Sequence, residues 1–541
     1  MATEGRPPRR RGAKKKGGAK STKSAAKGAP ATPPTAEQAK LSDDSAAERA
    51  GFTPRTLDRS VIAIPLLREI AEEQRANQRV LHHVVIDLNL EFRGGRDRAR
   101  DRVTRLVSEL PARPDGSQPV VANTSQYLFA SLYGDEIQAL VRTDREEGHG
   151  SDHRGAIFRV WPDFPIRSLI VKSVSTVKAD AAHSAFAAFG ADIVWAVVDS
   201  GVDAAHVHFK QFRNLELEES LTHFDFTLGN PLAQPASSKS ALTDEAGHGT
   251  HVAGIIAGAL NGKPGSAIVK AVSRRWSEDG DTESQLESYD SITGMAPRCG
   301  IASFKVLDKD GNGRTSSVIQ ALEKIQEING YGRRILIHGV NLSVGYDFEP
   351  EWFACGQSPL CVEVDRLVRS GVVVVVAAGN TGYGVQTTTG RGNVSSGLPL
   401  SINDPGNAEL AITVGSTHRD MPHTYGVSYF SSKGPTGDGR LKPDLLAPGE
   451  KIISCAAGGL RAEAASQLAK GKFQYLEQSG TSMSAPHVSG VIAAFLSVRR
   501  EYIGQPEKVK QIFVSAATDL NRDRYFQGSG LVDLMRAIQS V

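Results

Sequence analysis

Residues Gly480–His487, with the sequence GTSMSAPH, decide the fold of this chain. Ser482 stands in a turn of small residues, and an apolar stretch rich in alanine and valine follows it. A serine at the start of a helix has an exposed hydroxyl, and the free backbone amides of the first turn face any negative charge that forms beside it. The segment therefore predicts a helix with a nucleophilic serine at its start. We expect Pro486 in the first turn of that helix, where a missing amide costs little.

Two segments upstream supply partners for this serine. Asp199 ends an apolar run within the sequence VVDSGVD, and His248 lies between glycines in the sequence GHGTHVAG, at the expected start of the helix 250–260. In a serine-protease triad, a carboxylate orients an imidazole, and the imidazole takes the proton of the serine hydroxyl. The order Asp, His, Ser along the chain is one of the known triad orders. Asp199, His248 and Ser482 are therefore the candidate catalytic residues.

Together, these three segments resemble those of the subtilisin-like serine proteases, the subtilase family. The sequence VVAAGNTG, residues 375–382, resembles the family segment whose asparagine donates a hydrogen bond to the oxyanion. The resemblance implies that Asn380 and the amide of Ser482 form this oxyanion site; a turn residue is the alternative reading of Asn380. It also implies a serine endopeptidase that works through an acyl-enzyme. The alternative function is a catalytically silent regulatory or scaffold protein on the same fold.

A further resemblance concerns substrate binding. The sequence NLSVG, residues 341–345, is similar to the strand on which subtilases pair an extended peptide through backbone hydrogen bonds. The resemblance implies a wall for the residue before the cut, made of Ser343, Val344, Gly345, Ala377, Ala378 and Gly379. Because these residues are small, we expect an open and mainly apolar slot for protein or peptide substrates.

The fold class follows from apolar runs that alternate with helical stretches. The runs are 193–198, 301–307, 335–340, 372–376 and 410–414. Nearly continuous β-branched strands indicate a sheet that is buried on both faces, with parallel strands and crossover helices. We therefore expect an α/β subtilisin-like domain over residues 170–541. The polar segments 207–246 and 259–293 are expected to be surface insertions.

A smaller domain is expected before it, over residues 80–165. Strands are predicted at 83–90, 127–132 and 157–163, helices at 98–110 and from 134, and a short strand near 120–121. This α+β order resembles the inhibitory propeptide domain of subtilases, and an unrelated ferredoxin-like module is the alternative. If the resemblance holds, the protein cuts itself between about residues 163 and 175; an uncut connection is the alternative.

The first 50 residues differ in composition from the rest. Residues 1–40 hold eleven Lys or Arg and two Glu, and no aromatic residue precedes Phe52. Such a segment cannot bury enough surface to offset the entropy of ordering, so 1–50 is expected to be a disordered basic tail and 51–79 a linker or helical segment. The tail permits weak contact with nucleic acid or anionic surfaces, but it offers no aromatic residues for base stacking.

The remaining features bear on location and cofactors. No secretory signal and no membrane span is expected, and the four cysteines favour free thiols over a Cys355–Cys361 bridge, so we expect a cytoplasmic protein. No cofactor is required. Subtilases often bind calcium, but the sequence assigns no metal ligands, and the segment 308–313 reads as a polar turn rather than a calcium loop because the bidentate Glu of an EF-hand is absent. His251 and His487 are expected to be structural.

Overall fold

The computed structural model describes residues 61–541 except 112, 114–118, 120, 124–125, 148–154, 163–171, 228–237, 277–281, 348–353, 389–391 and 469–470. The chain divides into two units, residues 1–50 and 51–541, and every described residue belongs to the second. The predicted basic tail and most of the predicted processing segment lie outside the described residues.

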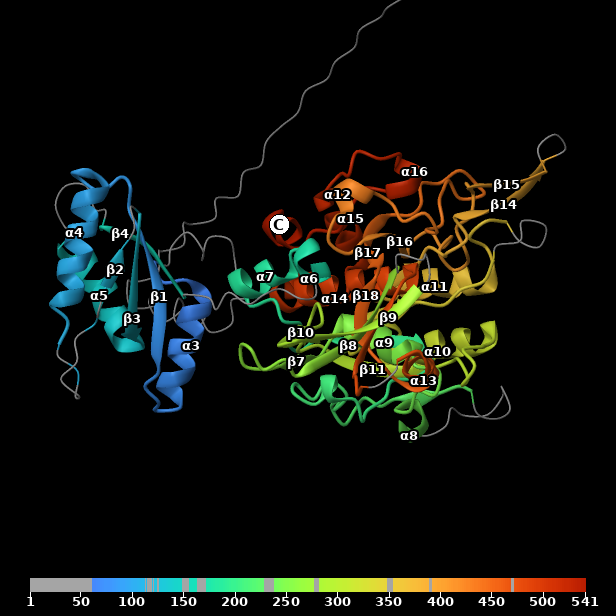
Figure 1. Ribbon diagram of the computed structural model, residues 1–541, viewed down its shortest axis with the longest axis horizontal. Helices are drawn as coiled ribbons and strands as arrows, with labels where there is room; N and C mark the ends of the chain where they lie inside the picture. The colour runs from blue at the N-terminus through green and yellow to red at the C-terminus, as the bar shows by residue number, and fades with distance from the viewer. Residues whose placement is uncertain are drawn as a thin grey trace, which may run out of the picture. The chain divides into compact units, whose positions relative to one another are not determined.

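The N-terminal part is a four-stranded antiparallel sheet with helices (Figure 1). Its elements are α3 (Ile64–Arg75), β1 (Leu81–Leu88), α4 (Gly95–Ser108), β2 (Val121–Asn123), β3 (Tyr127–Tyr133), α5 (Gly134–Glu147) and β4 (Ile157–Pro162). Buried and exposed residues alternate along β1, so one face of the sheet packs into an apolar core with α4 and α5. The order β-α-β-β-α-β, with the sheet order β2-β3-β1-β4, is typical of a ferredoxin-like fold.

The C-terminal part, residues 172–541, carries the candidate catalytic residues and is called the catalytic part below. It is built on a seven-stranded sheet with the order β17-β16-β13-β12-β5-β11-β6, and all its pairs are parallel. The strands are β5 (Val194–Asp199), β6 (Phe224–Asp225), β11 (Gly300–Lys305), β12 (Gly339–Leu342), β13 (Val373–Ala377), β16 (Ile412–His418) and β17 (Leu445–Glu450). Successive residues of β5 enter two different cores: Trp195 and Val197 join one, Ala196 and Val198 the other. The predicted parallel sheet, buried on both faces, is confirmed.

Helices cover both faces of this sheet (Figure 1). One core contains α9 (His248–Ile256), α14 (Thr481–Val498) and α15 (Pro506–Ala516); the other contains α10 (Thr315–Ile328) and α11 (Pro359–Arg369). The remaining helices are α6 (Lys172–Thr176), α7 (Ala179–Phe186), α8 (Ser238–Ala241), α12 (Pro422–Tyr425), α13 (Gly458–Ser466), α16 (Arg524–Gln527) and α17 (Leu534–Gln539). The remaining strands are β7 (Ala259–Asn261), β8 (Val269–Trp276), β9 (Thr282–Tyr289), β10 (Ser291–Thr293), β14 (Tyr383–Thr388), β15 (Gly392–Gly397), β18 (Ile452–Cys455) and β19 (Tyr475–Gln478).

The strand predicted at 335–340 is shifted in the structure, because β12 begins only at Gly339. The side chain of Asn329 accepts hydrogen bonds from the amides of Leu336 and Ile337 and donates one to the carbonyl oxygen of Ile337. These backbone groups are therefore satisfied outside the sheet ladder. Gly339 is required where the strand starts, since a Cβ there would lie 2.2 Å from the ring of Trp195.

The prediction that 207–246 and 259–293 are surface insertions is wrong in part. His208 is 1% exposed, and β6 forms the edge of the seven-stranded sheet. In the second segment, β8 and β9 form a sheet with β18 and β19, and Val269 and Ala271 are fully buried. Both segments therefore contribute to the core, although much of their sequence is polar.

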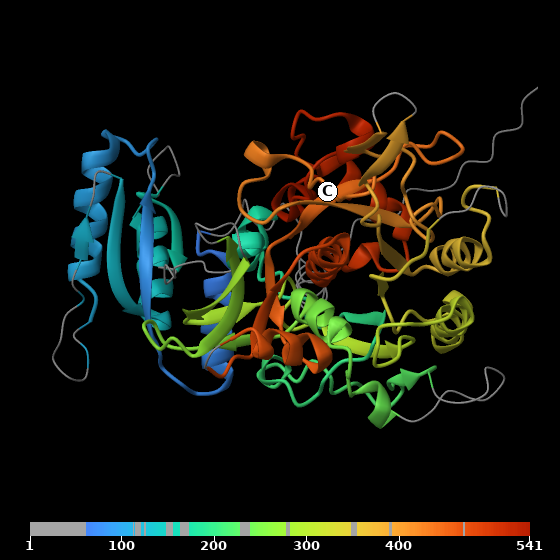
Figure 2. The ribbon, with the colours of Figure 1, turned by 45° about the vertical axis from the view of Figure 1, so that its right-hand side comes forward.

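Helix α14 is the central helix of the catalytic part (Figure 2). It is the one helix among the described residues that is long and apolar enough to cross a membrane, but 83% of it is buried inside the protein. Pro486 lies inside this helix rather than in its first turn, so the prediction for this residue is wrong. The carbonyl oxygen of Ser482, four residues earlier, therefore has no helical amide to accept from.

Candidate active site

The candidate residues meet at the carboxyl ends of three neighbouring strands. Asp199 is the last residue of β5, Ser343 directly follows β12, and Asn380 comes three residues after β13. Ligand sites in open parallel sheets lie at this edge, because loops from several strands converge there. His248 and Ser482 come from elsewhere: they are the first residue of α9 and the second residue of α14.

Asp199 and His248 form the pair that the sequence predicts. The Nδ1 atom of His248 lies 2.8 Å from the Oδ1 atom of Asp199. The carboxylate is fully buried and also accepts a hydrogen bond from the amide of Ser200, whereas the imidazole is 30% exposed. This contact fixes the proton of the neutral ring on Nδ1 and leaves Nε2 free to accept a proton.

The charge of this pair changes the basicity of the imidazole. Burial lowers the pKa of His248, but the charge of Asp199, its hydrogen bond and the nearby Asp244 outweigh this effect and raise the pKa above 6.5. A raised pKa means that the folded protein stabilises the imidazolium. A base that works through a protonated intermediate needs this stabilisation.

A second buried carboxylate holds the segments that carry this pair. Asp244 accepts hydrogen bonds from the hydroxyl of Ser200 and the amide of Gly247, and both the amide and the hydroxyl of Thr250 donate to its other oxygen. Ser200 accepts in turn from the amide of Gly249. Burial raises the pKa of the Asp244 carboxyl, although these hydrogen bonds act in the opposite direction. Asp244 thus ties the turn after Asp199 to the helix start at His248.

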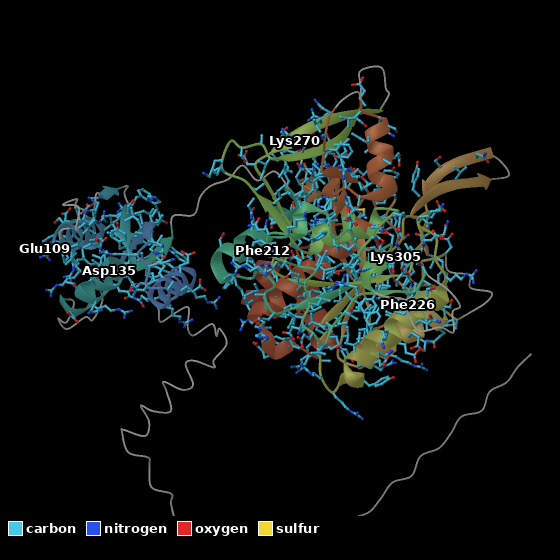
Figure 3. The ribbon with its side chains drawn as sticks, turned by 90° about the horizontal axis from the view of Figure 1, so that it is seen from below. Glu109, Asp135, Phe212, Phe226, Lys270 and Lys305 are labelled. Carbon is cyan, nitrogen blue, oxygen red and sulfur yellow. The ribbon has the colours of Figure 1, made fainter. Side chains whose placement is uncertain are left out.

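Lys305 anchors the same region from the neighbouring strand. It is the last residue of β11 and pairs in register with Asp199 of β5. Its ammonium, labelled in Figure 3, donates to the carbonyl oxygen of Thr243 at 3.2 Å and forms an ion pair with Glu245. Asp244 and Lys305 were not predicted from the sequence, because neither lies in a recognisable motif. The one available signal was the acidic character of Asp244, four positions before His248.

Ser482 is held by a reciprocal contact with Ser343. The hydroxyl of Ser482 donates to the carbonyl oxygen of Ser343 at 3.1 Å, and it makes no hydrogen bond with His248. The hydroxyl of Ser343 donates at 2.9 Å to the carbonyl oxygen of Ser482, the group that Pro486 leaves without a helical partner. Asn341 donates to the Ser343 hydroxyl, and Ser489 donates to Asn341, each at 2.9 Å. A chain of side chains therefore replaces the missing helical hydrogen bond.

Asn380 is oriented by the residue before Ser482. Its Oδ1 atom accepts from the amide of Thr481 at 2.9 Å and from the hydroxyl of Thr481 at 3.1 Å. Its Nδ2 amide therefore points away from these donors, and it has no acceptor among the described residues. The amide of Ser482 has no helical partner either, because it lies in the first turn of α14. Asn380 and Ser482 thus each bring a donor without a partner, as far as the structure describes the chain, and both residues line the same cavity.

A cavity of about 700 Å³ lies over these residues. His248, Asn380 and Ser482 line it, while Asp199 lies behind His248. Five of the six predicted wall residues also line it: Ser343, Val344, Gly345, Ala377 and Gly379. Ala378 does not, because it is fully buried and its backbone pairs with Val414 and Asn403. A cavity of this size holds a short segment of peptide.

Of the other sequence candidates, His251 and His487 do not line this cavity, whereas Gly311, Asn312 and Gly313 of the segment 308–313 do. His251 and His487 are fully buried, and burial lowers the pKa of His251 to about 3 and that of His487 to about 4. In the segment 308–313, the carboxylate of Asp308 accepts from two backbone amides of its own turn. The described residues contain no group of three or more His, Cys, Asp or Glu side chains that could hold a metal ion. All four cysteines are free.

The chain is similar to several known proteins. The model of the subtilase family matches residues 190–530. Serine protease AprX of Bacillus subtilis (strain 168) is 28% identical over 358 residues, which cover 64% of this chain and 66% of that protein. Pyrolysin of Pyrococcus furiosus is 30% identical over 54% of this chain, which spans only 21% of the relative, and subtilisin E of Bacillus subtilis (strain 168) is 28% identical over 68% of this chain and 70% of the relative.

One solved structure, a cold adapted subtilisin-like serine proteinase, is 24% identical with a TM-score of 0.39 and covers 64% of this chain and 88% of that one. The match of the family model extends over more than half of the chain and includes the segments that carry Asp199, His248, Asn380 and Ser482. The resemblance noted in the sequence is therefore confirmed, and the chain belongs to the subtilase family.

Proposed function

We propose that this protein is a serine endopeptidase that cuts peptide bonds through an acyl-enzyme. Ser482 is the nucleophile, His248 is first the general base and then the general acid, and Asp199 orients the imidazole. Asn380 and the amide of Ser482 donate to the oxyanion. The proposal rests on the 2.8 Å contact between His248 and the buried Asp199, together with Ser482 in the same cavity.

The steps follow from these positions. The hydroxyl of Ser482 leaves the carbonyl oxygen of Ser343 and attacks the substrate carbonyl carbon, while Nε2 of His248 takes its proton. His248 returns this proton to the leaving amine when the peptide bond breaks, and the acyl group stays on Ser482 as an ester. A water molecule then attacks the ester, gives a proton to His248, and the proton returns to Ser482 as the acid product leaves. The protein is regenerated unchanged.

The rival function is a silent regulatory or scaffold protein. Against it, each of the four positions that the mechanism requires holds a competent side chain, and the Asp199–His248 contact is formed. A fluorophosphonate probe, which reacts with activated serines, should label the wild-type protein and fail to label Ser482→Ala. Labelling that persists in Ser482→Ala, or an unlabelled wild-type protein that leaves an unfolded protein intact, would contradict the proposal.

We also propose that residues 80–165 act as an inhibitory domain and that the chain cuts itself between about residues 163 and 175. The ferredoxin-like topology of this domain supports the idea, as does its position directly before the catalytic part. Intact mass spectrometry should find a shortened wild-type chain and a full-length Ser482→Ala chain. Self-cleavage is wrong if both chains stay full length while a peptide substrate is cleaved.

Two accessory proposals concern the surroundings of the protein. The four free cysteines support a reducing compartment such as the cytoplasm. The basic segment 1–40 supports weak, salt-dependent contact with nucleic acid or anionic surfaces, which deletion of these residues should abolish. Calcium stays an expectation from the family, and chelation followed by measurement of thermal inactivation would test it.

A further inference from the structure

A hairpin beside the candidate active site presents an exposed apolar face. Strands β14 and β15 pair with each other and with no other described strand, and they project from the rest of the catalytic part (Figures 1 and 3). Tyr383 and Val385 occupy alternate positions of β14, so both point to the same face. The ring of Tyr429 meets the ring of Tyr383 edge-on, with centroids 5.7 Å apart. Tyr383, Val385 and Tyr429 are called the hairpin patch below.

The three side chains of the hairpin patch are strongly exposed to solvent, although they are large and apolar or aromatic. Tyr383 is 48% exposed, Val385 64% and Tyr429 67%. Single exposed apolar residues are common on proteins, but adjoining ones mark surfaces that bind a partner. Tyrosine is enriched in binding surfaces, because it combines a large apolar ring with a hydroxyl that can form hydrogen bonds.

The root of the hairpin is held firmly. Gly382 donates through its amide to the carbonyl oxygen of Phe430, and its own carbonyl oxygen accepts from the amide of Leu398, both at 2.9 Å. The ammonium of Lys433, a residue only 6% exposed, donates to the carbonyl oxygens of Gly382, Tyr429 and Ser431 at 2.7–3.0 Å. This one cation joins the start of β14 to the segment that carries Tyr429. The start of β14 and the segment that carries Tyr429 are therefore held together before any partner binds.

The hairpin patch follows the wall of the active-site cavity along the chain, although its three residues do not line the cavity. Asn380 and Thr381 line the cavity, and Gly382 and Tyr383 follow directly along the chain. Three residues of extended chain span at most about 11 Å, so Tyr383 lies within that distance of Asn380. A polypeptide that leaves the cavity on this side reaches the patch within a few residues.

We propose that the hairpin patch is a docking surface for a second segment of the substrate polypeptide, an extended segment with aromatic and apolar side chains. This proposal rests on the proposed function. The free edge of β14 offers backbone groups for strand addition, and the patch offers apolar contact for alternate side chains of the added strand. An unfolded chain supplies both features, whereas a folded protein has its backbone paired and its apolar side chains buried. The patch thus favours long unfolded polypeptides over short peptides.

A set of three substrates tests the docking surface by catalysis. They are a fluorogenic tetrapeptide that the protein cleaves, and two 20-residue peptides with this sequence in their centre, flanked by Tyr, Phe and Leu in one and by Ser and Gly in the other. In the wild-type protein, we expect kcat/KM to be about tenfold higher for the aromatic peptide than for the Ser/Gly peptide. Tyr383→Ser/Tyr429→Ser should bring this ratio close to one and leave cleavage of the tetrapeptide unchanged.

Tyr331→Ser is the matched control, since Tyr331 is 65% exposed and does not line the cavity. The control should keep the wild-type ratio. An unchanged ratio in Tyr383→Ser/Tyr429→Ser would overturn the proposal, and so would an equal loss for the tetrapeptide, because the patch would then act on the catalytic groups rather than on distant parts of the substrate.

A binding measurement separates this proposal from the proposed function. Fluorescence anisotropy of the labelled aromatic peptide with Ser482→Ala should show binding that weakens about tenfold when Tyr383→Ser/Tyr429→Ser is added. If this dependence is present while the wild-type protein cleaves nothing, the docking surface stands and the endopeptidase function is wrong. If cleavage proceeds while both the binding and the ratio ignore the two tyrosines, the docking surface is wrong and the endopeptidase function stands.

Discussion

Removal of the Ser343 hydroxyl tests how the nucleophilic serine is held. This hydroxyl donates to the carbonyl oxygen of Ser482 and accepts from the amide of Asn341, each at 2.9 Å, and Ser343 is only 6% exposed. Ser343→Ala leaves both groups without a partner. Since an unsatisfied buried polar group costs about 1–3 kcal/mol, we expect the free energy of unfolding to fall by about 2–4 kcal/mol.

A second substitution should return part of this loss. Pro486→Ala restores a backbone amide four residues after Ser482, where a helix directs it to the carbonyl oxygen of Ser482. In the Pro486→Ala background this oxygen keeps a partner when Ser343 is changed. We therefore expect Ser343→Ala to cost about 1 kcal/mol less there than in the presence of Pro486.

This coupling can be measured by urea-induced unfolding of four variants: the reference protein, Ser343→Ala, Pro486→Ala and the double variant. All four should carry Ser482→Ala, so that the proteins do not digest each other during the measurement. Ser489→Ala is the matched control, because it removes the far end of the same chain of side chains and leaves the carbonyl oxygen of Ser482 paired. Pro486→Ala should not reduce the cost of Ser489→Ala. An equal cost of Ser343→Ala in both backgrounds would refute the idea that this hydroxyl replaces a helical hydrogen bond.

Three other substitutions have expected outcomes. Because the pKa of His248 is raised, the acid limb of the profile of kcat/KM against pH should lie above pH 6.5. Asp199→Asn should move this limb to lower pH and reduce kcat about 10⁴-fold. A limb that does not move would count against His248 as the base. The same raised pKa stabilises the folded protein fully below pH 6.5 and less as the pH rises through the folded-state value. Asp244→Asn places an amide donor against donors of Ser200, Gly247 and Thr250, so it should lower the free energy of unfolding by about 2 kcal/mol and reduce kcat; unchanged urea midpoints would contradict this. Gly382→Ala brings a Cβ to 1.9 Å from the carbonyl oxygen of Ser431 and should cost about 1–3 kcal/mol in the same assay, whereas Gly397→Ala, where the nearest atom is 3.9 Å away, should be tolerated.

The parts of the fold that could be predicted from the sequence are those with a local signal. The valine run of β13 and the apolar run that ends at Asp199 gave the sheet and one edge of the site, because a buried strand requires such residues wherever it lies. The positions of Ser482 and His248 at helix starts were also predictable, because an apolar helical stretch follows each of them in the sequence. The shift of β12 was not, because it depends on the side chain of Asn329, which binds backbone groups seven and eight residues further on.

The long-range contacts that support the site could not be predicted from the sequence either. Lys305 contacts Thr243, 62 residues earlier along the chain, and Asp244 contacts Ser200, 44 residues earlier. The fold brings these partners together, whereas Gly247 and Thr250, the other partners of Asp244, are close to it in the sequence. Likewise, Pro486 is tolerated inside α14 because Ser343, 139 residues away from Ser482 along the chain, supplies the missing donor. Long-range hydrogen bonds of this kind leave no periodic trace in the sequence.

The burial of the two helices that carry His248 and Ser482 has a consequence for how the protein loses activity. His248 and Ser482 lie in the first turns of α9 and α14, and buried residues of both helices belong to the same core as β5 and β13. Elements of such a core open only in the least frequent fluctuations, close to global unfolding. Heat inactivation should therefore coincide with the cooperative unfolding of the entire catalytic part, and it should not result from an earlier local unfolding of loops. The residual rate of turnover would then be proportional to the fraction of molecules that are still folded.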